Sequence, residues 1–149
     1  MTTFTYNRKA TFDYEILENY EAGMVLFGFE VKAIKTGQMS LAGTFVTVRG
    51  GELYLTNAYI APYQPKNTPP DYDPNRSRKL LLRKEEIASL IGKTKQKGLT
   101  LVPIKVYTKR GKLKLEFALA KGKKKFDKRS KIIERETKRK IDRAIREKY

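Results

Sequence analysis

Strict alternation of residue type near position 115 constrains the fold of this chain most. Leucine or phenylalanine occupies every second position from 113 to 119, a period of two that is typical of a β-strand with one buried face. The preceding segment, residues 99–108, is rich in β-branched and aromatic residues, and Lys-Arg-Gly-Lys at 109–112 is a plausible turn. The two segments therefore predict an antiparallel hairpin.

Pro103 interrupts the first strand of this hairpin. Proline has no N–H to donate to a neighbouring strand, so we expect a sheet edge or a β-bulge there. The same kind of composition predicts further strands at residues 12–19, 24–28, 45–49 and 52–57. Gly50-Gly51 joins the last two as a second hairpin.

One helix is clearly predicted at residues 84–97, where Ile87, Leu90, Ile91 and Thr94 share a face. Two glutamates occupy its first turn, and Gly98 follows its end. A weaker helix is expected at residues 30–35. Five or six short strands with a helix inserted late predict a mainly β fold, a small partly open antiparallel barrel of the OB type with about three helices. A generic α+β sandwich is the alternative.

The charge of the chain indicates a polyanionic partner. There are 33 Lys and Arg residues against 16 Asp and Glu residues, a net charge of +17 in 149 residues. This exceeds what solubility requires, so nucleic acid is the leading candidate and an anionic membrane the second. No apolar run approaches the roughly 20 residues of a membrane span, and the first ten residues lack the apolar core of a signal peptide. We therefore expect a cytoplasmic protein that does not act at a membrane.

The distribution of charge predicts a body and a tail. Residues 121–149 hold 14 basic and 5 acidic side chains, a net charge of +9, and apolar residues are sparse there. The first 120 residues hold 19 basic and 11 acidic side chains. The tail has only a thin apolar stripe, at Ile133, Ile141, Ile145 and Tyr149, so we expect it to be disordered in isolation and helical only when bound.

Two missing residue types narrow the possible chemistry. The chain contains no Cys and no His, which excludes disulfides, thiolate metal sites, cysteine nucleophiles and imidazole acid–base catalysis. Glu85 and Glu86 are adjacent carboxylates, but neighbouring helix positions point about 100° apart and the first helical turn already accounts for them. We expect no metal, no cofactor and no catalytic residue.

A surface loop and a basic run separate the two halves of the body. Residues 61–75 carry five of the six prolines and must form a loop. Residues 76–84 follow, an apolar triplet between basic ends. This run is read equally well as a buried strand or as a set of phosphate contacts beside the tyrosines at 59, 63 and 72, where bases could stack.

Several segments of the chain match one known family in their order and spacing. They include Asn7-Arg8-Lys9-Ala10, Tyr20-Glu21-Ala22-Gly23, Gly28-Phe29-Glu30-Val31-Lys32, Arg78-Lys79-Leu80-Leu81-Leu82, Lys97-Gly98-Leu99-Thr100-Leu101-Val102-Pro103 and Ala120-Lys121-Gly122-Lys123-Lys124. The family that the chain resembles in these segments is SmpB. The resemblance covers nearly the whole chain, from residue 7 to about residue 135. It implies an OB-like body, residues 1–120, and a tail, residues 121–149, that becomes helical on the ribosome.

The resemblance implies a function and a set of partners. A member of this family is a non-catalytic factor that binds the tRNA-like domain of transfer-messenger RNA (tmRNA) and delivers it to stalled ribosomes for trans-translation. Its partners would be tmRNA and the decoding centre and mRNA channel of the small ribosomal subunit. Elongation factor Tu and alanyl-tRNA synthetase would be reached through the RNA complex.

The resemblance also implies site residues. The RNA-binding set corresponds to Asn7, Glu21, Leu81 and Lys114, with Arg76, Arg78 and Lys79 as phosphate ligands. The set for the ribosomal decoding centre corresponds to Lys121, Lys123, Lys124, Phe126, Asp127, Lys128 and Arg129. Three positions depart from the family pattern: Phe29, Tyr72 and Thr137.

Two other classes of function compete with this interpretation. An RNA-modifying or RNA-cleaving enzyme would need a catalytic set that the composition does not supply. A generic basic, ribosome-associated structural RNA-binding protein is the stronger alternative, because a basic tail and a β-barrel suit it equally well. Enrichment of tmRNA over bulk ribosomal RNA in a pull-down would distinguish these readings.

Overall fold

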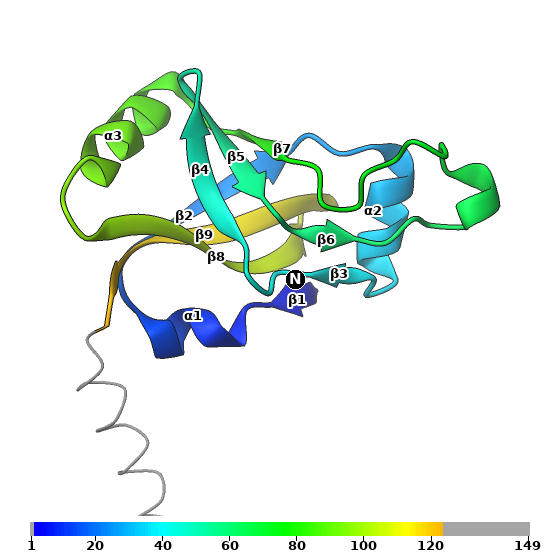
Figure 1. Cartoon of the computed structure of the whole chain (residues 1–149), viewed down its shortest axis with the longest axis horizontal. Coiled ribbons are helices and arrows are strands. Elements are labelled where there is room, and N and C mark those ends of the chain that lie inside the picture. The colour runs from blue at the N-terminus through cyan, green and yellow to red at the C-terminus, as the bar shows by residue number, and fades with distance from the viewer. Residues whose placement is uncertain (1, 124–149) are drawn as a thin grey trace, which may run out of the picture.

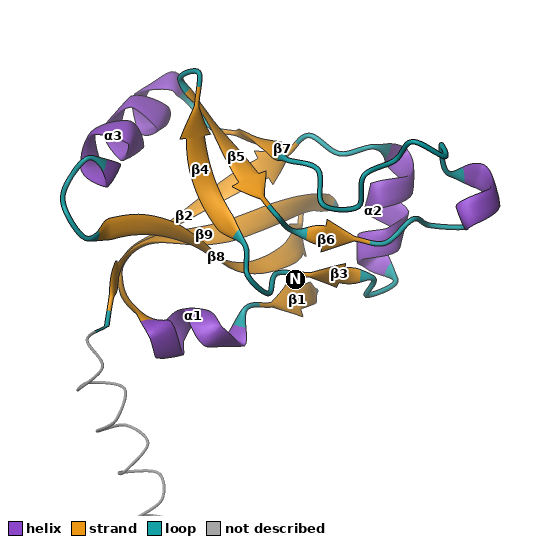
Figure 2. Ribbon diagram, in the orientation of Figure 1, coloured by secondary structure: helices purple, strands orange, loops and turns teal. Residues whose placement is uncertain are grey.

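Nine β-strands and three α-helices make up residues 2–123, the part of the chain that the computed structural model describes (Figures 1 and 2). The strands are β1 (Thr3–Tyr6), β2 (Tyr14–Met24), β3 (Met39–Ser40), β4 (Phe45–Arg49), β5 (Glu52–Thr56), β6 (Tyr59–Ile60), β7 (Arg78–Leu81), β8 (Leu99–Lys109) and β9 (Lys112–Gly122). The helices are α1 (Arg8–Asp13), α2 (Gly28–Lys35) and α3 (Lys84–Thr94), with one 3-10 turn at Pro65–Asn67.

Six of these strands pair in a ring. The order is β8-β4-β5-β7-β2-β9, and the ring closes because β9 also pairs with β8, while β1 extends the sheet beside β8. Closure is uneven, since β4 and β8 share a single residue pair, Val46 with Leu101, whereas β8 and β9 pair along their whole length. All these pairings are antiparallel. The prediction of a mainly β, OB-like, partly open antiparallel barrel with about three helices is confirmed.

The predicted hairpin is the longest feature of the barrel. Its two turn residues, Arg110 and Gly111, have φ angles of 52° and 76°, as a two-residue type I′ turn requires. The β8–β9 register shifts between Pro103 and Lys105, which is a β-bulge. Pro103 therefore sits where its missing N–H is tolerated, and the bulge that we expected there is confirmed.

Both faces of β9 are covered, which simple alternation did not predict. Leu115 and Phe117 face the main core, whereas Ala118 and Ala120 belong to a second, smaller cluster that includes Ala10 of α1. A six-residue helix with one buried residue leaves almost no periodic signal, so the sequence pattern missed α1. Small alanine side chains let α1 lie close against the sheet.

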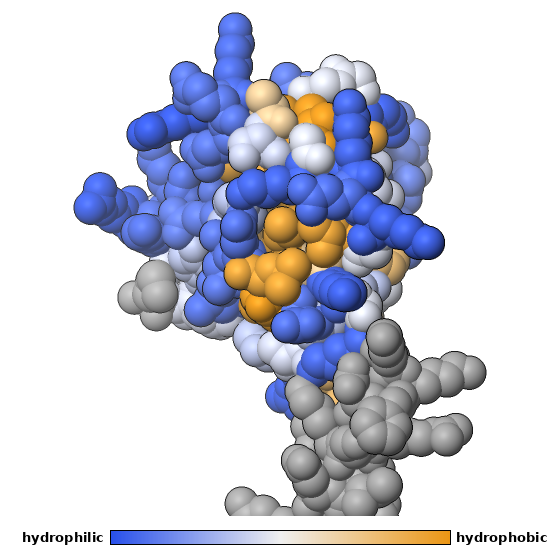
Figure 3. All heavy atoms as spheres, turned by 90° about the vertical axis from the view of Figure 1, so that its left-hand side faces the viewer, coloured by the Kyte–Doolittle hydropathy of each residue, from blue (hydrophilic) through white to orange (hydrophobic). Residues whose placement is uncertain are grey.

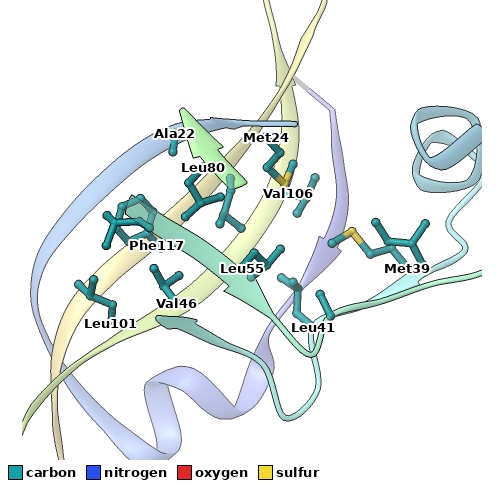
Figure 4. Packing of buried hydrophobic residues seen from close by; sticks show 14 of the residues in the cluster. Ala22, Met24, Met39, Leu41, Val46, Leu55, Leu80, Leu101, Val106 and Phe117 are labelled. Carbon is teal, nitrogen blue, oxygen red and sulfur yellow. The ribbon is translucent and has the colours of Figure 1, made fainter. Parts of the chain in front are cut away.

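The main core fills the inside of the barrel (Figure 4). Its buried side chains come from every strand of the ring and from α2 and α3, and they include Ala22, Met24, Ile34, Val46, Leu53, Leu55, Leu80, Leu90, Leu101, Val106, Leu115 and Phe117. Each buried leucine or phenylalanine contributes about 1.5–3 kcal/mol relative to an exposed one. The core therefore fixes the outward positions on the same strands, where the candidate contact residues lie.

Three predicted element boundaries were wrong. Strand 12–19 begins at Tyr14 and runs on to Met24, and no separate strand exists at 24–28. The chain leaves the sheet after Met24 because the Glu30 carboxylate accepts the N–H of Phe27 at 2.9 Å and holds the start of α2. The helix expected at 84–97 ends at Thr94.

The surface matches the ionic composition of the chain. Figure 3 shows one face, with mostly hydrophilic side chains around a limited apolar area. Residues 61–75 form the predicted loop, with only the short 3-10 turn in it, and lie beside α2 (Figure 1). Within residues 2–123, no helix has the length and apolar character that crossing a membrane would need.

Candidate nucleic-acid interface

A hollow of about 350 Å³ opens where β2, β7 and the β8–β9 turn meet α2. We call it the basic hollow, and its lining residues are Gly23, Met24, Leu26, Val31, Lys35, Leu81, Gly111, Lys112, Leu113 and Lys114. Three lysines from two separate elements converge on it. The lining of the basic hollow includes two of the residues implied by the family resemblance, Leu81 and Lys114.

Leu81 is exposed because of the alternation along β7. Leu80 is 1% exposed and faces the core, so its neighbour Leu81 faces outward and is 53% exposed. Opposite it on β2 lies Gly23, and a Cβ at Gly23 would make only an ordinary van der Waals contact, 3.4 Å, with a Leu81 methyl group. Leu81 is therefore not a core leucine but an apolar group presented at the surface.

Glu21 lies beside the basic hollow, on the same face of β2 as Gly23. Its carboxylate accepts a hydrogen bond from the Tyr107 hydroxyl and another from Lys109 Nζ at 3.5 Å. The Tyr107 hydrogen bond is the main cause of a lowered pKa of Glu21, to which Lys109 and Lys114 add and which partial burial opposes. Glu21 is thus a fixed anion among lysines.

Tyr107 connects Glu21 on β2 with Lys114 on β9. It pairs across the hairpin with Lys114, and its hydroxyl reaches Glu21 on β2. Burial raises the pKa of Tyr107, and the adjacent Glu21 carboxylate raises it further, so the phenol keeps its proton and remains a donor. Sequence reasoning missed Tyr107, although pairing the predicted hairpin about its turn would have placed it opposite Lys114.

Asn7 does not lie in the basic hollow. It stands at the start of α1, where its backbone N–H donates to the Ile104 carbonyl at 2.7 Å and its side-chain Nδ2 donates to the Pro103 carbonyl at 2.9 Å. It lines a different hollow together with Arg8 and Lys9. The structure therefore gives Asn7 a role in fixing α1 to β8, and a direct RNA contact by Asn7 stays a prediction.

Arg78 was wrongly expected to be a phosphate ligand. Its side chain is 0% exposed, and its Nη2 donates to Glu30 Oε2 at 2.6 Å. Nη1 and Nη2 also donate to the carbonyls of Ala58 and Pro74. A guanidinium buried and bonded in this way has no face left for RNA, so Arg78 belongs to the interior.

Arg76 shares the same carboxylate. Its guanidinium donates to both oxygens of Glu30 and is about one quarter exposed. Burial would raise the pKa of Glu30, but hydrogen bonds from Arg76, the Phe27 N–H and Arg78 outweigh it and lower that pKa. Arg76 could turn only a limited edge toward a phosphate.

Tyr72 completes this buried network from the loop. Its hydroxyl lies 2.9 Å from Glu30 Oε2 and accepts from Arg78 Nη2 at 3.0 Å. Burial first, and then the Glu30 carboxylate, raise the pKa of Tyr72 to about 12. The network thus ties the loop 61–75, β7 and α2 together around one carboxylate.

The remaining expected basic contacts are distributed along the surface. Lys79 is exposed on β7 and lies 3.8 Å from Glu52. Lys121 is exposed near the end of β9, and Lys123 Nζ donates to the Thr11 carbonyl at 2.6 Å. The other predicted decoding-centre residues lie outside the described residues: Lys124, Phe126, Asp127, Lys128 and Arg129.

The three tyrosines expected to offer stacking surfaces differ in exposure. Only Tyr59 is well exposed, at 43%. Tyr63 packs partly against the core, and Tyr72 is held by the Glu30 network. Within the described chain, 2–123, no group of three or more carboxylates is placed to hold a metal ion.

The comparisons with known proteins agree on one family. The family described as "SmpB protein" matches residues 4–147. An SsrA-binding protein of Thermosynechococcus vestitus is 50% identical over 141 residues, which are 95% of this chain and 93% of that one. An SsrA-binding protein of Sulfurihydrogenibium sp. is 52% identical over 140 residues, covering 94% of this chain and 91% of that one.

A solved structure shares the fold. It is described as "tmRNA-SmpB: a journey to the center of the bacterial ribosome", and it superposes with a TM-score of 0.66 at 53% sequence identity. The match covers 80% of this chain and 84% of that chain. Sequence and fold therefore lead to the same family.

Proposed function

The chain belongs to the SmpB protein family, and we propose that it binds the tRNA-like domain of tmRNA and delivers this RNA to stalled ribosomes for trans-translation. The single observation that carries the RNA contact is the basic hollow. There, Leu81 and Lys114 line one concave surface beside Glu21, although they come from distant parts of the chain. This is the convergence that a shape-specific RNA contact needs.

The groups around the hollow divide the work of recognition. Lys35, Lys112 and Lys114 supply positive charge for phosphates, which gives affinity without sequence preference. The Glu21 carboxylate accepts from an amino group or a sugar hydroxyl, and the Tyr107 hydroxyl holds it in place. Leu81 covers an apolar face of a base or ribose. None of these roles requires bond making or breaking, and the protein acts without catalysis in the cytoplasm.

In this proposal, residues 121–149 contact the ribosome, whereas the barrel binds tmRNA. The net charge of this tail suits an RNA-lined channel, and we assign Lys121, Lys123, Lys124, Phe126, Asp127, Lys128 and Arg129 to the decoding centre of the small subunit. Elongation factor Tu and alanyl-tRNA synthetase are reached through the bound RNA rather than through the barrel.

A pull-down of RNA by the tagged protein tests this function. The pull-down starts from a lysate from which assembled ribosomes have been removed. From this lysate we expect tmRNA to be enriched far above ribosomal RNA, and we expect Lys114→Ala to reduce the enrichment. Recovery of ribosomal RNA in proportion to its abundance, with no tmRNA enrichment, would favour a generic ribosome-associated structural protein instead. The variant Lys97→Ala, an exposed loop lysine outside the hollow, is the control.

A further inference from the structure

A second hollow, of about 380 Å³, lies on the other side of α2 from the basic hollow. We call it the aromatic hollow, and its lining residues are Phe27, Phe29, Pro69, Asp71, Tyr72, Asp73 and Arg76. Phe29 lines this hollow and Val31 lines the basic one, and two positions along a helix point about 200° apart. One helix therefore separates the two hollows, and an RNA molecule bound at one is within reach of the other.

The walls are aromatic and already ordered. Phe27 and Phe29 stack with ring centroids 5.4 Å apart, and Phe29 meets Tyr72 edge to face at 4.7 Å. Phe27 is nevertheless 50% exposed. Because the Tyr72 hydroxyl is bonded to Glu30, the tyrosine ring is held in place before any ligand arrives. A flat ring that enters loses little free energy to reordering of these walls.

The polar groups at the rim distinguish among flat ligands. Asp73 Oδ1 already accepts the Asn75 N–H at 2.9 Å. Asp71 is exposed, and within residues 2–123 it has no hydrogen bond or ion pair. A free carboxylate binds best to two adjacent donors, and among the RNA bases guanine presents such a pair, N1–H and the N2 amino group.

The same groups disfavour the other obvious ligands. Two carboxylates at the rim repel a phosphate group, so the RNA backbone must stay outside while a base enters. An arginine or lysine side chain would meet the Arg76 guanidinium, which already lies 4.1 Å from the Phe27 ring centroid. A neutral aromatic ring with donors on one edge meets neither objection.

We propose that the aromatic hollow binds an unpaired guanine base of RNA, with Asp71 accepting from its Watson–Crick edge and the exposed part of Phe27 and the other aromatic side chains of the lining packing against its ring. This rests on the proposed function only in that the ligand is RNA. It assigns a second contact to the barrel, apart from the basic hollow and built from Phe27, Phe29 and Tyr72. Two of these, Phe29 and Tyr72, are positions where this chain departs from the family pattern.

Binding of short single-stranded RNA by the full chain tests the proposal. The probes are three pentauridine-based oligonucleotides whose central base is guanine, adenine or inosine, followed by fluorescence anisotropy. We expect guanine to bind about five- to tenfold tighter than adenine, the discrimination of one bidentate contact. Inosine lacks the N2 amino group and should fall between them. Equal affinity for guanine and adenine would overturn the proposal.

Variants locate the contact. Asp71→Asn should abolish the preference for guanine, whereas Glu15→Gln, which makes the same change at an exposed position on β2, should keep it. Phe27→Ala should weaken both oligonucleotides by about fivefold or more, since the apolar contact between the half-exposed Phe27 side chain and the base is lost. A preference that survives Asp71→Asn would contradict the assignment. If the chain shows no guanine preference but binds an oligoarginine peptide, and that binding requires Asp71 and Phe27, the ligand of the aromatic hollow is a basic protein segment and not an RNA base.

Different measurements test the guanine site and the proposed binding of tmRNA, so one can be rejected while the other is kept. Glu21→Ala should weaken binding to the tRNA-like domain of tmRNA but leave the guanine preference of the pentamers unchanged. If the wild-type chain fails to bind the tRNA-like domain yet still prefers guanine, only the proposed function is lost. If it binds that domain and shows no base preference, only the guanine site is lost.

Discussion

At the scale of single residues, two carboxylates with lowered pKa values serve different ends. Glu30 is fully buried between Arg76 and Arg78, and its charge holds three segments of the barrel together. Glu21 is exposed, and its charge is fixed at the surface by Tyr107. Burial therefore separates the carboxylate that stabilises the fold from the one that is available to a partner.

Loss of one of the three lysines that line the basic hollow should reduce electrostatic attraction to RNA. For Lys114→Ala, we expect weaker binding to the tRNA-like domain and a salt dependence whose log–log slope is shallower by about one, the effect of one lost phosphate contact. The measurement is a titration by filter binding or calorimetry at several salt concentrations. An unchanged slope would remove Lys114 from the interface, and Lys97→Ala, which should retain the wild-type slope, is the matched control.

Removal of the buried carboxylate should destabilise the fold. Glu30→Gln leaves Arg78 buried without its counter-ion, and we expect a loss of about 3–5 kcal/mol in the free energy of unfolding. Urea denaturation measures this loss directly. A change below about 1 kcal/mol would mean that water or the Tyr72 hydroxyl can replace the carboxylate.

The same substitution should change the pH dependence of stability. The folded pKa of Glu30 is lowered from its ordinary 4.5, so its contribution is fully present above about pH 4.5. The contribution is lost as pH falls through the lower folded pKa. The difference in Tm between wild type and Glu30→Gln should therefore be constant near neutral pH and shrink below about pH 4.5.

Sequence reasoning brought together candidate contact residues but missed their surroundings. Segment matching pointed to Leu81 and Lys114, and both line the basic hollow. Arg78 was mistaken for a surface residue, because a basic residue beside a leucine run has the same local pattern whether its partner is a phosphate or a buried glutamate. That partner, Glu30, lies 48 residues away in the chain, and periodicity carries no information about such a distance.

At the scale of elements, the hairpin β8–β9 was predictable because its signals are local. Alternation, a turn with glycine and a proline at the bulge all occur within residues 99–120. The short elements β1, β3, β6 and α1 were not predictable, since their two to six residues are fixed by pairing with distant strands rather than by their own pattern. The predicted strand at residues 24–28 failed for a different, local reason, because the Glu30 carboxylate accepts the Phe27 N–H and begins α2 there.

Two glycines should respond oppositely to the same substitution. Gly111 has φ of +76° in the hairpin turn, where a Cβ is strained, so Gly111→Ala should cost about 1–2 kcal/mol of stability. Gly92 lies inside α3 with open space around it, so Gly92→Ala should add about 0.8–1 kcal/mol. Thermal unfolding of both variants measures the pair. Equal effects of the same sign would contradict the turn geometry.

At the scale of the whole molecule, the contacts made by residues 121–123 bear on where the predicted body ends. Strand β9 continues past residue 120 to Gly122, and the Lys123 N–H donates to the Asp13 carbonyl at 3.0 Å. A chain cut after residue 123 should keep the wild-type Tm and most of its affinity for tmRNA. A cut after residue 120 should be less stable, because it removes the last two strand residues. Differential scanning calorimetry and an RNA titration compare the two truncations.

Function and binding should separate in the tail. Replacing Asp127, Lys128 and Arg129 together with alanine should leave affinity for tmRNA nearly intact and stop peptide tagging on stalled ribosomes. The assay is tag addition on a message without a stop codon, run beside an RNA-binding measurement on the same variant. Wild-type tagging would remove these residues from the decoding centre, and parallel loss of both activities would place them on the RNA-binding surface.

Closure of the ring has a consequence for how the protein is made. Strand β2 pairs with β9, and Ala22 lies opposite Leu115 and Tyr14 opposite Gly122. Strand β2 therefore cannot pair on this side until β9 has been synthesised. The β8–β9 hairpin can form early, but it must then join a strand synthesised long before, and such non-local pairing is slow. A copy whose synthesis ends before residue 112 keeps unpaired edges on β2 and β8 and lacks Phe117 in its core. Such a truncated copy is expected to be aggregation-prone rather than a weaker form of the protein.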